Sequence, residues 1–145
     1  MADVIGSFNG EYRFLSNFWL APVTYEGITY PSSEHAYQAA KTLNTDIREI
    51  FSVLDSPAKA KKLGQLIEIR ADWEHVKINV MREIIEAKFE NHPDLMSKLM
   101  DTKGQKLIEG NTWGDTFWGE CPLGTGRNEL GKILMGIRDD IMRIG

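Results

Sequence analysis

The residues around position 33–42 place several polar side chains on one face of a predicted helix. They stand at positions i, i+3, i+4 and i+7, which coincide on one side of an α-helix. They are Glu34, Tyr37, Gln38 and Lys41. Glu34 falls in the first turn, where free backbone N–H groups and the helix dipole favour a negative charge. An acid, an amide and an amine together can line a catalytic pocket, although the pattern by itself favours a solvated first-turn glutamate.

A segment near the N-terminus, RFLSNFW at residues 13–19, alternates polar and aromatic residues. An arginine can bind an anion, and aromatic rings can stack on a base or a sugar. The candidate ligand-binding residues here are Arg13, Phe14, Ser16, Asn17 and Phe18. An extended segment with turn chemistry at Ser16 and Asn17 explains the pattern equally well, and both interpretations stay open.

Residues 109–126 form a long segment without a clear period, with five glycines and two tryptophans. Such a long irregular segment in a compact domain is usually either functional or a sign that its secondary structure has been assigned wrongly. Asp115 lies between the tryptophans, where a carboxylate held away from water would gain catalytic value. A turn aspartate with structural tryptophans is the alternative, but a loop position favours a functional role.

The stretch GTGRN at residues 124–128 leads into the last predicted helix. Flexible backbone before a helix N-terminus can bind an anion, so Arg127 and the N–H groups near Asn128 are candidates for holding phosphate. No strand precedes the glycines and no Walker lysine follows them. A loop with Asn128 as the helix cap is therefore the stronger interpretation.

Three further features are weaker. Trp73 and Lys77 lie one helical turn apart, which is more typical of a core tryptophan beside a lysine that reaches outward. The three histidines lack metal-ligand spacing, so we expect no metal site. Cys121, the single cysteine, has no evident histidine partner, so a cysteine nucleophile is not expected.

The elements that must position these residues are mostly helices. A hairpin is expected around Glu26-Gly27 within residues 23–30, and extended chain over residues 14–19. Six helices are predicted after it, at residues 33–42, 46–54, 57–64, 73–90, 93–104 and 130–141. Ser32, Asp46 and Ser56 are the expected N-caps of the first three. The predicted fold class is mainly α, with a small β element near the N-terminus.

Composition sets the broad class. The chain has 145 residues, of which 42% are hydrophobic, and a net charge of −4. We therefore expect one domain over residues 1–145, without a strongly basic nucleic-acid face. One cysteine, no secretory pattern and no run of ~20 apolar residues predict a soluble cytoplasmic protein that does not enter a membrane.

Four separated motifs together resemble the NADAR, or YbiA-like, family. They are FLSNF at 14–18, YPSSEHAYQAAK at 30–41, DTFWG at 115–119 and GRNELG at 126–131, in the family's order. The resemblance runs from about residue 10 to residue 142. It implies a mainly helical YbiA-like fold, no cofactor, and hydrolysis of an N-glycosidic bond at ribose.

The resemblance also implies a set of site residues. Glu34, Trp73 and Asp115 match the active-site positions, and Lys41 is a further catalytic candidate. Glu34 would contact the ribose and Asp115 would position water or the leaving group, or the reverse. Lys41 would be a phosphate cation, a proton donor or a Schiff-base nucleophile. The substrate-binding candidates are the five residues of segment 13–19 named above together with Tyr37, Lys77, Trp118, Gly119, Arg127 and Asn128.

Two substrate classes are compatible with the resemblance. One is an early phosphorylated intermediate of riboflavin biosynthesis, which would release ribose 5-phosphate. The other is ADP-ribose attached to guanine in nucleic acid, as removed by antitoxin-like enzymes. The acidic net charge favours the metabolite. A non-catalytic module that binds NAD or ADP-ribose is the rival from another class, and it would need no pair of carboxylates at Glu34 and Asp115. A structural domain without a ligand leaves the segment 109–126 unexplained.

Overall fold

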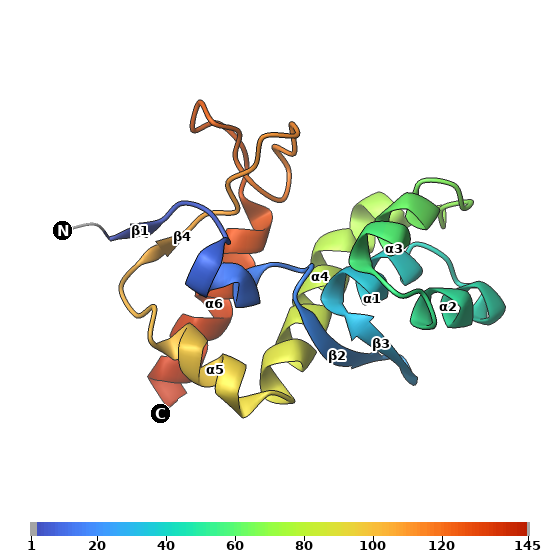
Figure 1. The fold of residues 1–145 in the computed structure, drawn as a ribbon, viewed down its shortest axis with the longest axis horizontal. Helices are drawn as coiled ribbons and strands as arrows, with labels where there is room; N and C mark the ends of the chain where they lie inside the picture. The colour runs from blue at the N-terminus through green and yellow to red at the C-terminus, as the bar shows by residue number, and fades with distance from the viewer. Residues whose placement is uncertain (1–2, 145) are drawn as a thin grey trace. The chain divides into compact units, whose positions relative to one another are not determined.

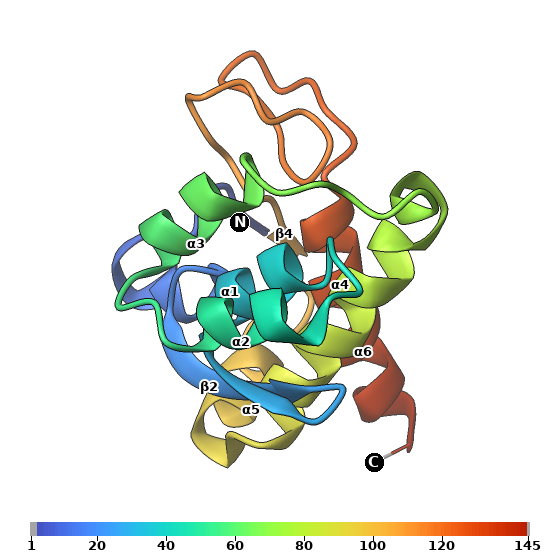
Figure 2. The same cartoon turned by 90° about the vertical axis from the view of Figure 1, so that its right-hand side faces the viewer.

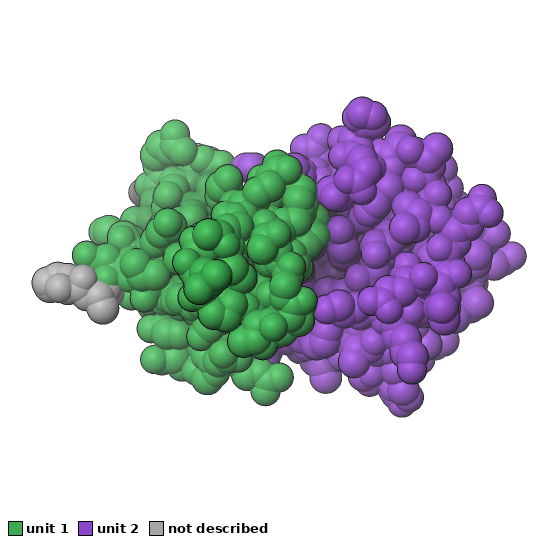
Figure 3. Space-filling model, turned by 90° about the horizontal axis from the view of Figure 1, so that it is seen from above, with its two compact units in different colours: residues 1–16, 93–145 green, residues 17–92 purple. Residues whose placement is uncertain are grey.

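The computed structural model describes residues 3–144 and divides into two compact units (Figure 3). Unit 1 comprises Met1–Ser16 and Pro93–Gly145, and unit 2 comprises Asn17–His92. Helices dominate both units, in agreement with the predicted class. The expectation of one domain over the chain stays a prediction. No described helix has the length and apolar character that crossing a membrane requires.

Unit 2 begins with a hairpin, as predicted. Strand β2 (Leu20–Tyr25) pairs antiparallel with β3 (Ile28–Ser32), with Val23 opposite Tyr30 (Figure 1). The two turn residues, Glu26 and Gly27, both have positive φ, at 47° and 88°. This is the combination that a two-residue turn with the right twist for a hairpin requires.

Helix α1 (Ser33–Ala39) follows β3 without a loop. The side chain of Ser32 caps it as predicted, because Ser32 Oγ accepts a hydrogen bond from the His35 N–H at 3.2 Å. All seven residues of α1 are buried. The helix ends at Ala39, three residues before the predicted end, with Lys41 N–H turning back to the Gln38 carbonyl at 3.2 Å.

Three more helices complete unit 2 and pack around α1 (Figure 2). Helix α2 is capped by Asn44, whose Oδ1 accepts from the Ile47 N–H, so the predicted cap at Asp46 is wrong by two residues. Ser56 caps α3, as predicted. The bounds are α2 Thr45–Ser52, α3 Pro57–Gly64 and α4 Trp73–Glu90.

Unit 1 starts with strand β1 (Val4–Ile5), which pairs in parallel with β4 (Lys106–Leu107). The extended segment predicted over residues 14–19 is wrong, because no strand forms there and residues 16–19 are turns and bends. A 3-10 helix, η1 (Gly10–Leu15), forms instead, with the Tyr12 N–H bonded to the Asn9 carbonyl. This tighter turn buries the adjacent side chains of Phe14 and Leu15 together, which an alternating strand would not do.

Helices α5 (Pro93–Met100) and α6 (Glu129–Ile144) form the helical part of unit 1, with α5 shorter than predicted. The buried guanidinium of Arg138 on α6 donates to the carbonyls of Thr102 and Gln105, at 2.9 and 2.8 Å. These bonds hold the chain after α5 against α6. Residues 109–128 then run as irregular loops at the N-terminal end of α6 (Figure 2).

Candidate active site

In unit 2, the predicted polar face of α1 is a buried site. Glu34 is only 8% exposed, and its Oε2 accepts a hydrogen bond of 2.6 Å from Gln38 Nε2. The interpretation of Glu34 as a solvated first-turn residue is therefore wrong. The sequence pattern missed this because α1 is covered by the hairpin and by helices α2, α3 and α4, which periodicity within one helix cannot show.

Asn17 accepts hydrogen bonds from the first two residues of α1. Its backbone carbonyl accepts from the Glu34 N–H at 3.1 Å, and its Oδ1 accepts from Ser33 Oγ at 2.8 Å. Its amide nitrogen lies 3.5 Å from Met81 Sδ. Asn17 was predicted to bind substrate. The structure shows that both of its carbonyl oxygens accept hydrogen bonds from the first residues of α1, which fixes the backbone position of Glu34, and its contact with substrate stays a prediction.

An aromatic pair joins α1 to α4. The rings of Tyr37 and Trp73 have centroids 5.2 Å apart at an interplanar angle of 53°. The ammonium of Lys41 lies 5.7 Å from the centroid of the Tyr37 ring. Trp73, the first residue of α4, is 5% exposed. The structure therefore brings Tyr37, Lys41 and Trp73 together, although they come from two helices.

The electrostatics of Lys41 depend on its neighbours. Burial lowers the pKa of Lys41 below its usual value, and the positive charges of Lys61 and Lys77 lower it further. The carboxylate of Glu34 opposes both effects and raises the pKa of Lys41. A lysine of this kind has a larger fraction of neutral amine at a given pH than an exposed one.

Lys77 lies on α4 one turn beyond Trp73. Its ammonium pairs with Glu74 Oε1 at 2.7 Å, and its side chain is largely covered. The sequence did not single out Lys61, on α3, which acts on Lys41 alongside Lys77. A sequence signal for Lys61 is absent, because α1 and α3 approach each other only in the tertiary structure.

In unit 1, Asp115 organises the loop that carries it. Its Oδ1 accepts from the N–H groups of Phe117 and Trp118, at 3.1 and 2.9 Å. The side chain of Asn111 bonds to both backbone groups of Asp115: its Nδ2 donates to the Asp115 carbonyl, and its Oδ1 accepts from the Asp115 N–H. The turn role considered for Asp115 is thus present. A catalytic role for this half-buried carboxylate stays a prediction.

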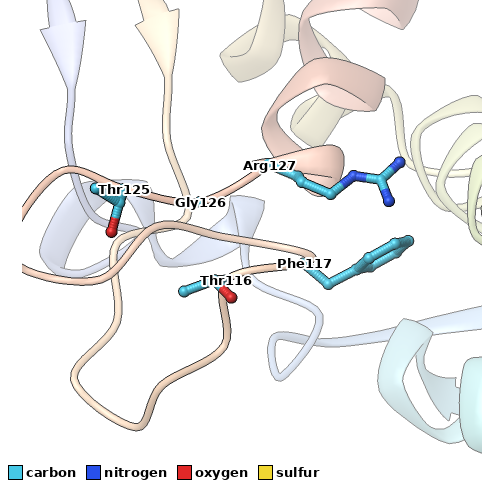
Figure 4. Close-up of a pocket in the computed structure, with 5 residues that line it drawn as sticks. All are labelled: Thr116, Phe117, Thr125, Gly126 and Arg127. Atoms are coloured by element: carbon cyan, nitrogen blue, oxygen red, sulfur yellow. The ribbon is translucent and has the colours of Figure 1, made fainter.

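Next to Asp115 lies a pocket of about 530 Å³ (Figure 4). Its lining residues are Thr116, Phe117, Thr125, Gly126 and Arg127. The Arg127 guanidinium lies 4.6 Å from the centroid of the Phe117 ring, and one of its edges pairs with Glu129 Oε2 at 2.8 Å. The pocket therefore offers an aromatic ring and a cation in one exposed place. Trp118 packs edge-on against Phe117 at 4.8 Å.

The backbone at the start of α6 is not an anion site. Its N–H groups donate to carbonyls of the Asp115 loop: Arg127 to Thr116, Asn128 to Gly119, Glu129 to Phe117 and Leu130 to Trp118. These four hydrogen bonds attach residues 116–119 to the N-terminal end of α6. The expectation that the N–H groups near Asn128 hold phosphate is therefore wrong, because their donors are already used within the protein.

Asn128 and Gly119 have structural surroundings. Asn128 has φ of 51°, and its buried side chain accepts from the Glu109 N–H at 3.0 Å and donates to the Leu107 carbonyl at 2.9 Å. It therefore neither caps α6 with its side chain nor offers a free amide to a ligand. A Cβ at Gly119 would collide with the Glu109 carbonyl oxygen, so the loop requires glycine there.

The residues of segment 13–19 differ in their surroundings. Phe14 is buried in the core of unit 1 beneath the ammonium of Lys98, and its role as a substrate-binding residue stays a prediction. Arg13 is exposed on η1, and Ser16 is half-buried. Phe18 is partly exposed in unit 2. The boundary between the units falls after Ser16, so Arg13, Phe14 and Ser16 belong to unit 1 and Phe18 belongs to unit 2.

Comparison with known proteins finds relatives along nearly the whole chain. A family model described as the NADAR domain matches residues 6–142. N-glycosidase YbiA of Escherichia coli is 38% identical over 146 residues, covering 97% of this chain and 91% of that protein. N-glycosidase Npun_R5314 of Nostoc punctiforme is 33% identical over 138 residues, covering 92% and 88%.

A longer protein contains a similar region. The riboflavin biosynthesis protein VVA0006 of Vibrio vulnificus is 37% identical over 133 residues, which cover 90% of this chain and 36% of that protein. Among solved structures, the NMR structure of Escherichia coli YbiA matches with a TM-score of 0.85 and 37% identity. The match covers 98% of this chain and 87% of that one.

Proposed function

Because the chain belongs to the NADAR family, as its four motifs indicated, we propose that it cleaves phosphorylated ribosyl intermediates of riboflavin biosynthesis and releases ribose 5-phosphate. The chain is an N-glycosidase, a hydrolase of N-glycosyl compounds, like the relatives that match most of its length. The riboflavin biosynthesis protein of Vibrio vulnificus supports the choice of substrate class.

One observation carries the catalytic part of the proposal. A buried carboxylate, Glu34, acts electrostatically on a lysine of lowered pKa, Lys41, and the lysine lies beside the Tyr37–Trp73 pair. A reader module for ADP-ribose would need aromatic and cationic groups but no buried acid beside an amine. The arrangement therefore favours catalysis over binding alone.

Glu34 has a clear task in this chemistry. Breaking the bond between ribose and nitrogen builds positive charge on the sugar ring. A carboxylate stabilises that charge more strongly where water is excluded, because little solvent screens the interaction. The Tyr37 and Trp73 rings supply an apolar surface that would help to exclude water from this site. We assign Glu34 to the ribose and Asp115, on unit 1, to the water or the leaving group.

The lowered pKa of Lys41 supports a role as a neutral amine. Attack of the Lys41 lone pair on C1 of the sugar would form a carbon–nitrogen bond while the bond from C1 to the base breaks and the base departs with a proton. The C1–O bond of the ring would then open, with the remaining proton of the Lys41 nitrogen passing to the ring oxygen, which gives an imine at C1. Water would then hydrolyse the resulting imine and return the free amine. Under this proposal, phosphate binding falls to other cations, with Lys77 in unit 2 and Arg127 in unit 1 as candidates.

The test is product analysis with two substrates. Purified protein is incubated with a phosphorylated riboflavin-biosynthesis intermediate or with ADP-ribosylated guanine in single-stranded DNA, and mass spectrometry looks for ribose 5-phosphate or ADP-ribose. We expect ribose 5-phosphate. Release of ADP-ribose alone would replace the metabolite with modified nucleic acid as the substrate.

A variant ties the activity to the site. Glu34→Gln should lower turnover about 10²–10⁴-fold, the typical effect of removing one acid–base group. The matched control is Glu90→Gln, at the exposed end of α4, which should leave turnover unchanged. Wild-type turnover by Glu34→Gln would refute the assignment of Glu34.

A further inference from the structure

The side chain of Gln38 has an environment that its own helix does not explain. It is 5% exposed, and its Nε2 donates the 2.6 Å hydrogen bond to Glu34 Oε2. Its Oε1 is buried and has no hydrogen-bond donor in the part of the chain that the structure describes. A buried amide oxygen without a donor costs free energy, so another gain must hold the amide in place.

The neighbour of Gln38 Oε1 is Gly64, at the end of α3. A Cβ at Gly64 would collide with Oε1 and would lie 2.8 Å from the amide carbon. The amide of Gln38 therefore fills the space that any side chain at position 64 would occupy. Gly64 has no positive φ, so the constraint comes from this close approach and not from its backbone conformation.

The two contacts fix which way the amide faces. With its nitrogen toward Glu34, Gln38 gives one N–H to a carboxylate, and a hydrogen bond to a charged acceptor is stronger than a neutral one. The opposite orientation would set oxygen against carboxylate oxygen and bury two N–H donors against Gly64. The packing on Gly64 thus leaves Gln38 only one useful orientation, in which it holds the Glu34 carboxylate.

We propose that Gln38 is a positioning residue for Glu34. Gly64, at the end of α3, makes this possible, because a residue without a side chain leaves room there for the Gln38 amide. The proposal rests on the proposed function, because it gives Gln38 a task in catalysis through Glu34. Gln38 itself touches neither the sugar nor the base. It holds the carboxylate in one place as charge develops on the substrate.

The first test replaces the donor. Gln38→Met keeps the length of the side chain and removes the N–H. We expect kcat for the phosphorylated intermediate to fall about 10- to 100-fold with KM within threefold of wild type, because a small displacement of a reacting group has an effect of this size. Gln65→Met, at an exposed glutamine just after α3, is the matched control. Wild-type kcat in Gln38→Met would overturn the proposal.

A conservative variant separates positioning from packing. In Gln38→Glu, the new carboxyl donates to Glu34 only while it is protonated. The rate of this variant relative to wild type should therefore rise as the pH falls, whereas that of Gln38→Met should not. A merely structural role predicts no such difference, so parallel pH profiles for the two variants would count against a positioning role.

The third test addresses Gly64 by stability. Gly64→Ala should destabilise the protein, because its Cβ collides with the Gln38 amide. In a Gln38→Ala background the nearest remaining atom is Gln38 Cβ at 3.3 Å, so the loss should be much smaller. Equal losses of unfolding free energy in the two backgrounds would show that the residues are not coupled.

These outcomes can be told apart from failure of the proposed function. Full activity in Glu34→Gln would remove the acid that Gln38 is meant to hold. An inactive Glu34→Gln protein together with a fully active Gln38→Met protein would instead reject only the inference about Gln38.

Discussion

The indole of Trp73 and the phenol ring of Tyr37 lie 5.2 Å apart, joining the first residue of α4 to the middle of α1. Rings at this separation and at an interplanar angle of 53° stabilise each other beyond the apolar area that they bury. The same pair borders Lys41, whose ammonium lies over the Tyr37 ring. Trp73 therefore has a stabilising contact with Tyr37, and its role in the active site stays a prediction.

The first prediction separates these two contributions. Trp73→Ala should lower the unfolding free energy by about 3–5 kcal/mol, as large-to-small changes of buried aromatic residues do. Trp73→Phe keeps a ring next to Tyr37 and should retain most of the stability. Urea denaturation measures both. A loss below about 1 kcal/mol in Trp73→Ala would contradict the packing role.

The second prediction concerns Lys41. As a neutral nucleophile, Lys41 should make the rate rise with pH through its pKa, which burial places below the usual 10.5. Arginine stays charged at every working pH. Lys41→Arg should therefore lower kcat at least ~10²-fold, while a mere phosphate cation would tolerate arginine.

Chemical trapping provides the decisive measurement for Lys41. Borohydride added during turnover of the phosphorylated intermediate should reduce the imine to a stable adduct at Lys41, which peptide mass spectrometry detects. The matched control is Lys62→Met, at an exposed lysine of α3, which should still give the adduct. Without an adduct in wild-type protein, the Schiff-base step is excluded.

The third prediction tests the two roles of Asp115. Asp115→Asn keeps an oxygen that can accept from the Phe117 and Trp118 N–H groups, so the loop should keep its structure while the charge is lost. If Asp115 acts on the water or the leaving group, kcat should fall about 10²–10⁴-fold with little change in melting temperature. Unchanged kcat would leave Asp115 as a turn residue only.

The fourth prediction is a pH dependence of stability from His35. This fully buried ring bonds to Ser32 Oγ at 2.7 Å and to the Leu54 carbonyl at 3.0 Å, and burial lowers its pKa below 6.5. Below pH 6.5 the unfolded chain therefore binds a proton that the folded chain does not. Stability is full above that pH and decreases as the pH falls toward the lower, folded-state pKa.

The measurement is urea denaturation between pH 4.5 and 8, values chosen on both sides of the ordinary histidine range. His35→Asn, which lacks this titration, should flatten the acid side of the stability curve. The control is His75→Asn, at an exposed histidine of α4. The same slope in wild type and His35→Asn would assign the pH dependence to other groups.

Several parts of the fold could be predicted because their causes are local. Ser32 and Ser56 cap helices with their own side chains, within three residues of the N–H groups that they accept from. Glu26 and Gly27 form a hairpin turn between alternating strands. The four motifs also indicated the NADAR family, which the comparisons confirm.

Local patterns failed where distant segments compete for the same groups. The start of α6 has the sequence of an anion site, but carbonyls from Thr116 to Gly119 already occupy its N–H groups. Segment 10–15 forms a 3-10 helix because burying Phe14 and Leu15 side by side outweighs the alternation in its sequence. Neither the carbonyls that bond to the start of α6 nor the core that buries Phe14 and Leu15 can be identified from a window of a few residues.

The sequence by itself determined which side chains share the face of α1, because helical spacing fixes that Glu34, Tyr37 and Gln38 lie on one side. Only the tertiary structure decided that this face is buried, that Gly64 seats the Gln38 amide, and that lysines of α3 and α4 act on Lys41. The physical reason is that backbone periodicity is set by neighbours along the chain, whereas burial and electrostatic surroundings are set by whichever elements pack against it.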